Sequence, residues 1–166
     1  RLEIRLVDNS GNVLSEASVE PFGVGEVFII AGQSYAENAN DAEMIIEDPA
    51  GRITVYDPMK GEWQIAHDPQ PGRIPNPKKQ DRLKGSIWPS AMNLLLPFIR
   101  VPIGMINVAA GGTASRQWVP GEPLFDDLFK AGVTAGNFRY VLWQQGESDI
   151  IENTNEEVYK SRIRAI

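Results

Sequence analysis

The sequence of 166 residues has no cysteine, which excludes disulfides, thiolate nucleophiles and thiolate-ligated metal sites but leaves the compartment undecided. Histidine occurs once, at His67, so no pair of histidines could bind a metal ion. The acidic residues Asp127, Glu147 and Asp149 do not have the spacing of a metal-ligand motif. We therefore predict no metal and no cofactor.

Positive charge and long apolar runs are also scarce. The chain has 16 lysine and arginine residues against 22 acidic ones, which gives a net charge of -6. This balance argues against nucleic acid or an anionic membrane surface as a partner, whereas a neutral or mildly anionic carbohydrate is compatible with it. No apolar run approaches the length of a membrane span, and no signal peptide is present, although a start at Arg1 leaves a removed leader open.

A β-branched apolar run that stops at a glycine is the most informative stretch. Residues 27–31 do not alternate between apolar and polar, which is typical of a strand covered on both faces in a parallel sheet. Gly32 permits a sharp exit, and a helix could open near Tyr35. Ser34 would then stand between a strand's carboxyl end and a helix N-terminus, a position that suits a nucleophile. A serine N-cap is the alternative.

Two later segments repeat this arrangement. Residues 104–110 lead into Gly111 and Gly112, and residues 139–143 lead into Gln144, Gln145, Gly146 and Glu147. Because ligands bind outside the carboxyl ends of parallel strands, the three junctions are predicted to meet in one crevice. They would supply a hydroxyl, glycine amides, a primary amide and a carboxylate, which are the parts of an acyl-transfer site. A glycine pair that merely turns a corner is the alternative.

Three motifs at these junctions, taken in their order along the chain, resemble the conserved sequence blocks of the SGNH hydrolases. Within this superfamily, the motifs are most similar to the branch of sialate O-acetylesterases and the acetylxylan esterases of carbohydrate esterase family six. The motifs are Gly32-Gln33-Ser34, Gly111-Gly112-Thr113 with Trp118, and residues 143–149. The resemblance runs from about residue 25 to the end. It implies a three-layer α/β/α, flavodoxin-like fold with a central parallel sheet, a substrate among acetylated sugars of the sialic acid or xylan type, and a secreted or periplasmic location.

The resemblance also implies roles for single residues. Ser34 matches the nucleophile, and its amide would be one oxyanion donor. Gly111 or Gly112 matches the second donor and Gln145 the third, while Glu147 matches an acid that orients the base or shapes the pocket. Substrate contacts are predicted at Gln33, Tyr35, Arg116, Trp118 and His67. For Arg116 and Trp118 the alternatives are a solvated arginine and a core tryptophan.

The chain departs from the family in two ways. Tyr35 stands where the family usually has asparagine, and the Asp-x-x-His block that carries the family's base does not occur. His67 is a candidate base, although an incidental histidine or a substrate contact is the alternative. We therefore predict that these residues are a portion of a longer serine O-acetylesterase whose catalytic histidine lies outside them. A non-catalytic carbohydrate-binding relative, an SGNH enzyme of lipid or thioester chains and a metal-dependent hydrolase are the other hypotheses.

Residues 1–22 are predicted to form a β-hairpin, and residues 23–166 the esterase domain, incomplete at its C-terminus. The hairpin is either the end of a preceding β-rich domain or an edge hairpin of the same domain. Further predicted elements are a strand at 52–56, a helix at 87–99 ended by Pro97, a helix at 124–131, and a helix capped by Thr154. The proline-rich stretch 68–79 is predicted to wall the substrate cleft.

Overall fold

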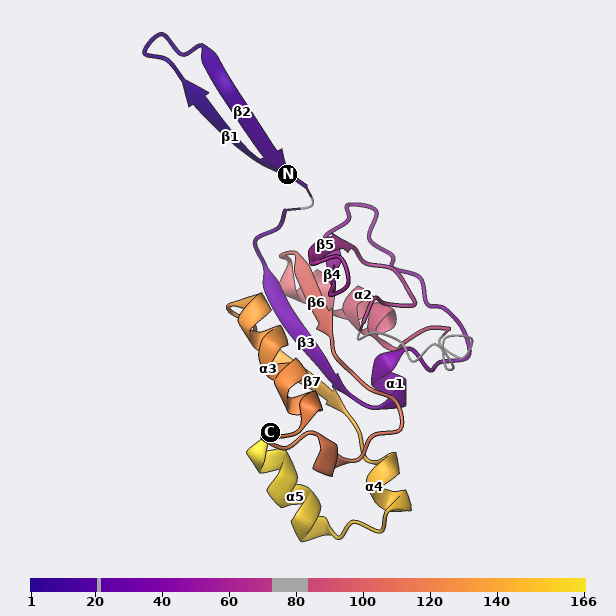
Figure 1. The fold of residues 1–166 in the computed structure, drawn as a ribbon. Helices are drawn as coiled ribbons and strands as arrows, with labels where there is room; N and C mark the ends of the chain where they lie inside the picture. The colour runs from indigo at the N-terminus through magenta and orange to yellow at the C-terminus, as the bar shows by residue number, and fades with distance from the viewer. Residues whose placement is uncertain (21, 73–83) are drawn as a thin grey trace.

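The computed structural model describes residues 1–20, 22–72 and 84–166. Strands β1 (Leu2–Val7) and β2 (Val13–Val19) pair antiparallel in a sheet of their own, as their alternating sequence predicts. This hairpin extends away from the rest of the chain, beyond the amino end of β3 (Figure 1). It is therefore not an edge of the main sheet.

The main sheet has five strands in the order β5-β4-β6-β3-β7. Its strands are β3 (Glu26–Gly32), β4 (Ile53–Asp57), β5 (Glu62–Ile65), β6 (Ile103–Asn107) and β7 (Tyr140–Gln144). All neighbouring strands are parallel except β4 and β5. Because β3 lies between β6 and β7, the carboxyl ends of these three strands are adjacent, which is the arrangement that the sequence predicted.

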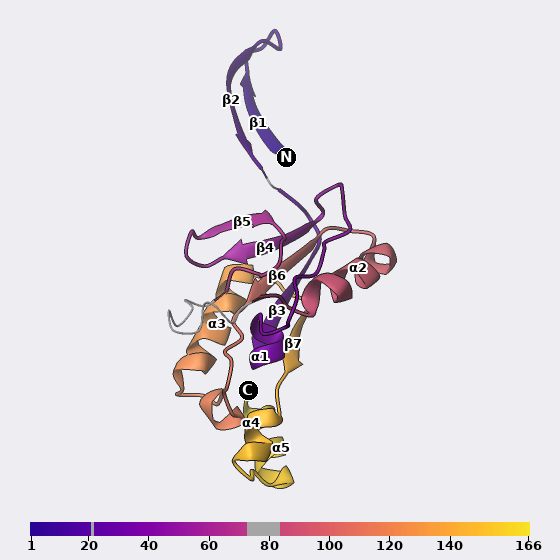
Figure 2. The same ribbon diagram turned by 90° about the vertical axis from the view of Figure 1, so that its right-hand side faces the viewer.

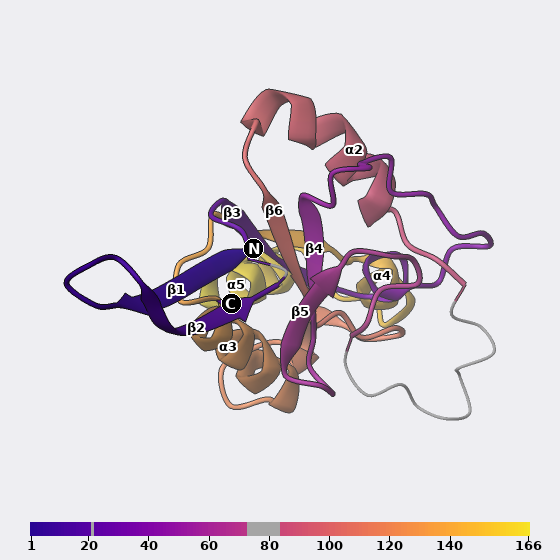
Figure 3. The ribbon, with the colours of Figure 1, turned by 90° about the horizontal axis from the view of Figure 1, so that it is seen from above.

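Helices cover both faces of the sheet. Helix α2 (Trp88–Ile99) lies on one face and α3 (Pro123–Ala135) on the other, as Figures 2 and 3 show from two directions. Four short elements lie toward the carboxyl ends of the strands: α1 (Ser34–Glu37), the 3-10 helix η2 (Ser115–Gln117), α4 (Glu147–Ile151) and α5 (Glu156–Ala165) (Figure 1). Among the described residues, no helix combines the length and apolarity that crossing a membrane requires.

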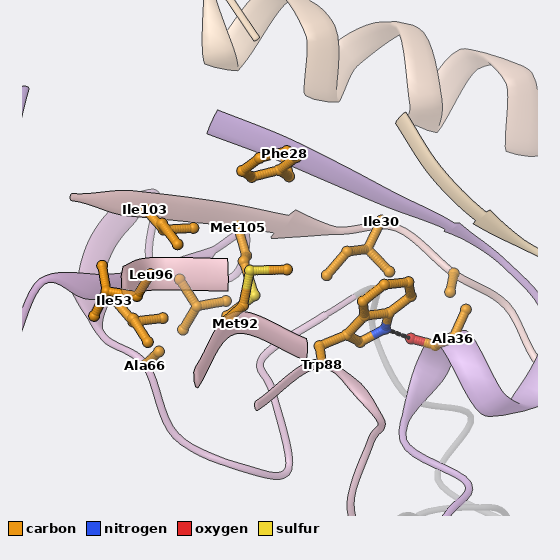
Figure 4. Packing of buried hydrophobic residues seen from close by; sticks show 12 residues of the cluster. Phe28, Ile30, Ala36, Ile53, Ala66, Trp88, Met92, Leu96, Ile103 and Met105 are labelled. Carbon is orange, nitrogen blue, oxygen red and sulfur yellow. Dashed lines mark hydrogen bonds between the residues drawn. The ribbon is translucent and has the colours of Figure 1, made fainter. Parts of the chain in front are cut away.

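The two layers of core packing follow from alternation along β3. Phe28 and Ile30 pack with α2 residues in one buried cluster, which Figure 4 shows from close by. Ile29 and Ala31 point to the other face and pack with Leu124 and other residues of α3. The uninterrupted apolar run of β3 is thus explained by burial on both faces. β7 differs, because it lies at the edge of the sheet and its first residues are exposed.

Three local expectations need correction. Pro97 lies inside α2, which ends at Ile99 before Arg100 adopts a left-handed conformation with φ 62°. The cap of α5 is Asn155, whose side chain accepts a hydrogen bond from the Val158 amide, and not Thr154. Strand β5 and helix α4 are additional elements. Most of the predicted cleft wall, from residue 73 onward, lies outside the described residues.

Candidate active site

Ser34 stands at the carboxyl end of β3 as the first residue of α1. The N-cap position belongs to Gln33, and no side chain caps the helix. The serine N-cap alternative is therefore not what the structure has. The Ser34 side chain is half-buried, and within the described part of the chain its hydroxyl has no hydrogen-bond partner. No hydrogen bond to the described residues therefore gives this hydroxyl a structural role.

Helix α1 has only four residues, and side chains from distant elements hold it. The Ala36 carbonyl accepts hydrogen bonds from Trp88 Nε1 at 2.9 Å and from Asn107 Nδ2 at 3.0 Å. Figure 4 shows the Trp88 bond as a dashed line to the Ala36 oxygen. Trp88 opens α2, and Asn107 ends β6. The backbone that carries Ser34 is thereby fixed to both elements.

The glycine pair after β6 lies against α1. The Gly111 amide donates to Glu37 Oε2 at 3.0 Å, and a Cβ on Gly111 would lie 3.7 Å from the Ser34 Cα. The Gly112 amide makes no hydrogen bond with any described residue, and Gly112 has a φ of +76°. Of the two candidates for the second oxyanion donor, Gly112 therefore has the unused amide. Glu37, one helical turn after Ser34, is a site residue that the motif comparison missed.

Gln145 lies between Thr113, which follows the glycine pair, and Gln33, which precedes Ser34. Its Nε2 is 2.6 Å from Asp149 Oδ2 and 3.2 Å from both the Thr113 carbonyl and Gln33 Oε1. An amide nitrogen has two hydrogens, so three acceptors already compete for them. Gln33 is only 3% exposed, and its Oε1 also faces the backbone amides of Gly146 and Ser148. Gln33 thus joins β3 to the turn after β7, which is a structural role in addition to the predicted substrate contact.

Glu147 begins α4 beside the end of β7. Its Oε1 accepts a hydrogen bond from Gln144 Nε2 at 2.8 Å, and Gln144 pairs in register with Gly32. Glu147 Oε2 and Gln144 Oε1 are both buried and have no donor among the described residues. Two buried acceptor atoms near the carboxyl end of β3 therefore have capacity for an N–H donor.

The predicted substrate contacts around this centre separate into two groups. Tyr35 directly follows Ser34 and is 50% exposed, so it lies at the rim. Trp118 is 0% exposed, donates to Thr113 Oγ1 at 3.0 Å and packs edge-on against Trp143. The structure therefore has the alternative to a substrate contact at Trp118, a core tryptophan, because the η2 turn folds this side chain into the core.

Arg116 and His67 are occupied elsewhere. Arg116 Nη2 lies 2.9 Å from Glu152 Oε1, and the hydrogen bond from Arg116 to Glu152 raises the pKa of the guanidinium. His67 follows β5 and lies 3.1 Å from Gln64 Nε2. Strands β4 and β6 separate β5 from β3. Because β5 is antiparallel to β4, its end lies toward the amino end of the sheet, away from Ser34. The structure therefore does not bring His67 and Ser34 together.

Asp149 is a second residue that motif spacing did not single out. It is 3% exposed, and its two oxygens accept hydrogen bonds from the Ser115 amide and hydroxyl, each at 2.6 Å. Burial acts to raise the pKa of this carboxyl, but the hydrogen bonds from Ser115 and Gln145 outweigh it and leave the pKa below its ordinary value. Asp149 is thus ionised at neutral pH.

This lowered pKa predicts acid sensitivity. Because the folded-state pKa lies below the unfolded one, Asp149 contributes stability above about pH 4 and loses it as the pH falls through the folded pKa. We expect the difference in unfolding free energy between wild type and Asp149→Asn to shrink between neutral pH and about pH 3. Urea unfolding of both proteins at the two pH values measures this. A difference that is undiminished in acid would contradict it.

One known protein family matches most of the chain. The family model described as carbohydrate esterase, sialic acid-specific acetylesterase matches residues 24–166. The chain belongs to this carbohydrate esterase family. A probable carbohydrate esterase of Arabidopsis thaliana is 31% identical to the chain over 163 residues, covering 86% of this chain and 62% of the relative. The chain thus spans less than two thirds of that esterase's length.

Solved structures agree on the fold. The crystal structure of an Arabidopsis thaliana protein superposes with a TM-score of 0.62 at 22% identity, covering 84% of this chain and 68% of that one. The structure of NanS gives 0.60 at 16% identity, covering 84% and 60%. A carbohydrate acetylesterase from Xanthomonas citri gives 0.50 at 20% identity, covering 75% and 33%. The family's α/β fold of the SGNH type is therefore the fold of this chain.

Proposed function

We propose that the chain is the nucleophile-bearing part of a serine carbohydrate esterase that removes O-acetyl groups from acetylated sugars. The observation that carries this proposal is the position of Ser34, half-buried at the carboxyl end of β3 and next to Gly111, whose neighbour Gly112 has an amide without a hydrogen bond to the described residues. A nucleophile next to preorganised N–H donors is the arrangement that acyl transfer requires. Membership of the carbohydrate esterase family supports an acetylated sugar as the substrate.

The proposed mechanism has two acyl-transfer steps. A base takes the Ser34 proton while Oγ attacks the acetyl carbonyl carbon, and the Ser34 and Gly112 amides donate to the oxyanion that forms. The base then protonates the departing sugar oxygen, which leaves an acetyl group on Ser34. In the second step the base activates water, which releases acetate and restores the hydroxyl.

The base is proposed to be a histidine outside residues 1–166. His67 lies beside Gln64 and away from Ser34, which supports a base other than His67. The buried, undonated Glu147 Oε2 supports a role for Glu147 as the acceptor that orients the imidazole N–H. A carbohydrate-binding relative without a base is the second candidate, and the lack of a partner for the Ser34 hydroxyl among the described residues is the observation that favours it.

One experiment separates these functions. The full-length protein is incubated with acetylated xylan, O-acetylated sialic acid and a series of nitrophenyl esters of increasing chain length, and acetate or nitrophenol release is measured. We expect hydrolysis of short acyl groups that declines with chain length. Binding of acetylated glycan without hydrolysis would instead establish the binding relative, and activity that rises with chain length would indicate a lipid or thioester substrate.

Replacing Gln145 by alanine is expected to lower kcat by about a hundred- to a thousand-fold if its amide donates to the oxyanion. In the structure, the Gln145 amide hydrogens face Asp149, Thr113 and Gln33. The contacts with Thr113 and Gln33, both at 3.2 Å, are the ones that a charged oxyanion could replace. Initial-rate kinetics and a thermal melt of wild type and variant measure the effect. Undiminished turnover would remove Gln145 from the mechanism.

A further inference from the structure

A single buried carboxylate joins the two loops that carry the proposed oxyanion donors. Asp149 Oδ2 accepts hydrogen bonds from the Ser115 amide and from Gln145 Nε2, both at 2.6 Å. Its Oδ1 accepts from the Ser115 hydroxyl at 2.6 Å and faces Arg162 Nη1 at 3.4 Å. Ser115 begins η2, just after the Gly112 turn, and Gln145 follows β7. The carboxylate therefore sets the distance between these two segments.

Counting hydrogens shows what this contact does to Gln145. A primary amide nitrogen has two hydrogens, and the bond to the ionised carboxylate is the shortest of the three contacts at Nε2. One hydrogen is therefore held by Asp149. The second is left between the Thr113 carbonyl and Gln33 Oε1, two neutral acceptors at 3.2 Å. With its first hydrogen fixed, the amide cannot rotate without breaking a charge-assisted bond.

We propose that Asp149 is a positioning residue that fixes the Gln145 amide, so that its second N–H is presented to the reacting carbonyl. This inference rests on the proposed esterase function. Asp149 touches no reacting atom and acts through Gln145. The donors around it leave no room for a substrate contact of its own.

A double-mutant cycle on the full-length protein tests the proposal. Asp149→Asn keeps the size of the side chain but removes its charge and one acceptor, so we expect kcat to fall about a hundred-fold with KM unchanged. In the Gln145→Ala background the same substitution should lower kcat by less than about three-fold, because its partner is already missing. Equal losses in both backgrounds would overturn the proposal, since Asp149 would then act independently of Gln145.

Glu152→Gln is the matched control. It breaks the Arg116 ion pair, which also joins η2 to the end of α4 but does not touch Gln145. We expect this variant to keep the wild-type kcat. A loss as large as that of Asp149→Asn would show that any loosening between these segments suffices, and would overturn a specific role for Asp149.

Two further measurements keep the proposal testable. If Asp149→Asn does not fold, Ser115→Ala takes its place in the cycle. Ser115→Ala should lower kcat several-fold in the wild-type background and leave it unchanged in the Gln145→Ala background. Equal losses in the two backgrounds would overturn the proposal. If the wild-type protein hydrolyses no acetyl ester, the proposed function fails, and the Gln145 side-chain amide signals in an NMR spectrum decide the inference separately. They should shift in Asp149→Asn and not in Glu152→Gln, and unchanged signals in both overturn it.

Discussion

Replacing Ser34 by alanine is expected to lower kcat on an acetyl ester by at least about four orders of magnitude while leaving the fold intact. The loss follows because the hydroxyl is the proposed site of acetyl transfer. The fold should be unaffected because the hydroxyl makes no hydrogen bond with the described residues and the side chain is only half-buried. Removing it therefore leaves no buried partner unsatisfied.

Initial-rate kinetics and urea unfolding of wild type and Ser34→Ala measure both parts of this result. Ser90→Ala is the matched control, because Ser90 is also a half-buried serine near the start of a helix. Its kcat should equal that of wild type. If Ser34→Ala retained turnover, Ser34 would not be the nucleophile; if it lost its stability instead, the hydroxyl would have a structural role.

The substitution Gly32→Ala is expected to destabilise the protein by about 4 kcal/mol or more. A Cβ at this position would lie 1.9 Å from the Gln144 carbonyl oxygen and 2.6 Å from its carbon. Both atoms belong to the neighbouring strand, so neither can move without breaking the β3–β7 ladder. Gly32 also has a φ of +124°, a conformation that only glycine adopts without strain.

The midpoint of urea unfolding measures this loss. Gly121→Ala is a suitable control, since Gly121 has a φ of +95° but a Cβ added there would have no atom of the described residues within 4 Å. It isolates the conformational cost, which should be about 1 to 2 kcal/mol. Equal shifts for the two variants would mean that the contact with Gln144 does not resist the added methyl group.

The sequence allowed the strands with strong local patterns to be predicted. β3 was identifiable because its apolar run ends at a glycine, and the hairpin because its residues alternate. β5 was not predicted, because four residues with one tryptophan and one isoleucine carry little pattern of their own. Its pairing with β4 decides its conformation, and such pairing is a tertiary effect.

The candidate site was predictable to the extent that it lies at strand ends. Ser34, the glycine pair and Gln145 follow three adjacent strands, so topology brings them together. Asp149 could not be singled out, because its partner Ser115 lies 34 residues earlier and their hydrogen bonds depend on the folded loops. Trp118 was predicted as a substrate contact because sequence does not reveal which way a turn faces.

The helix that carries Ser34 has only four residues, too few to be stable alone. Hydrogen bonds from Trp88 and Asn107 to its backbone stabilise it. Ser34 can therefore be in place only when the α2 side of the sheet is assembled. If Ser34 is the nucleophile, as we propose, turnover consequently reports on the folding of that layer. Met92 lies outside the site but in the same buried cluster as Ala36 and Trp88, so we expect a substitution there to disturb the position of Ser34.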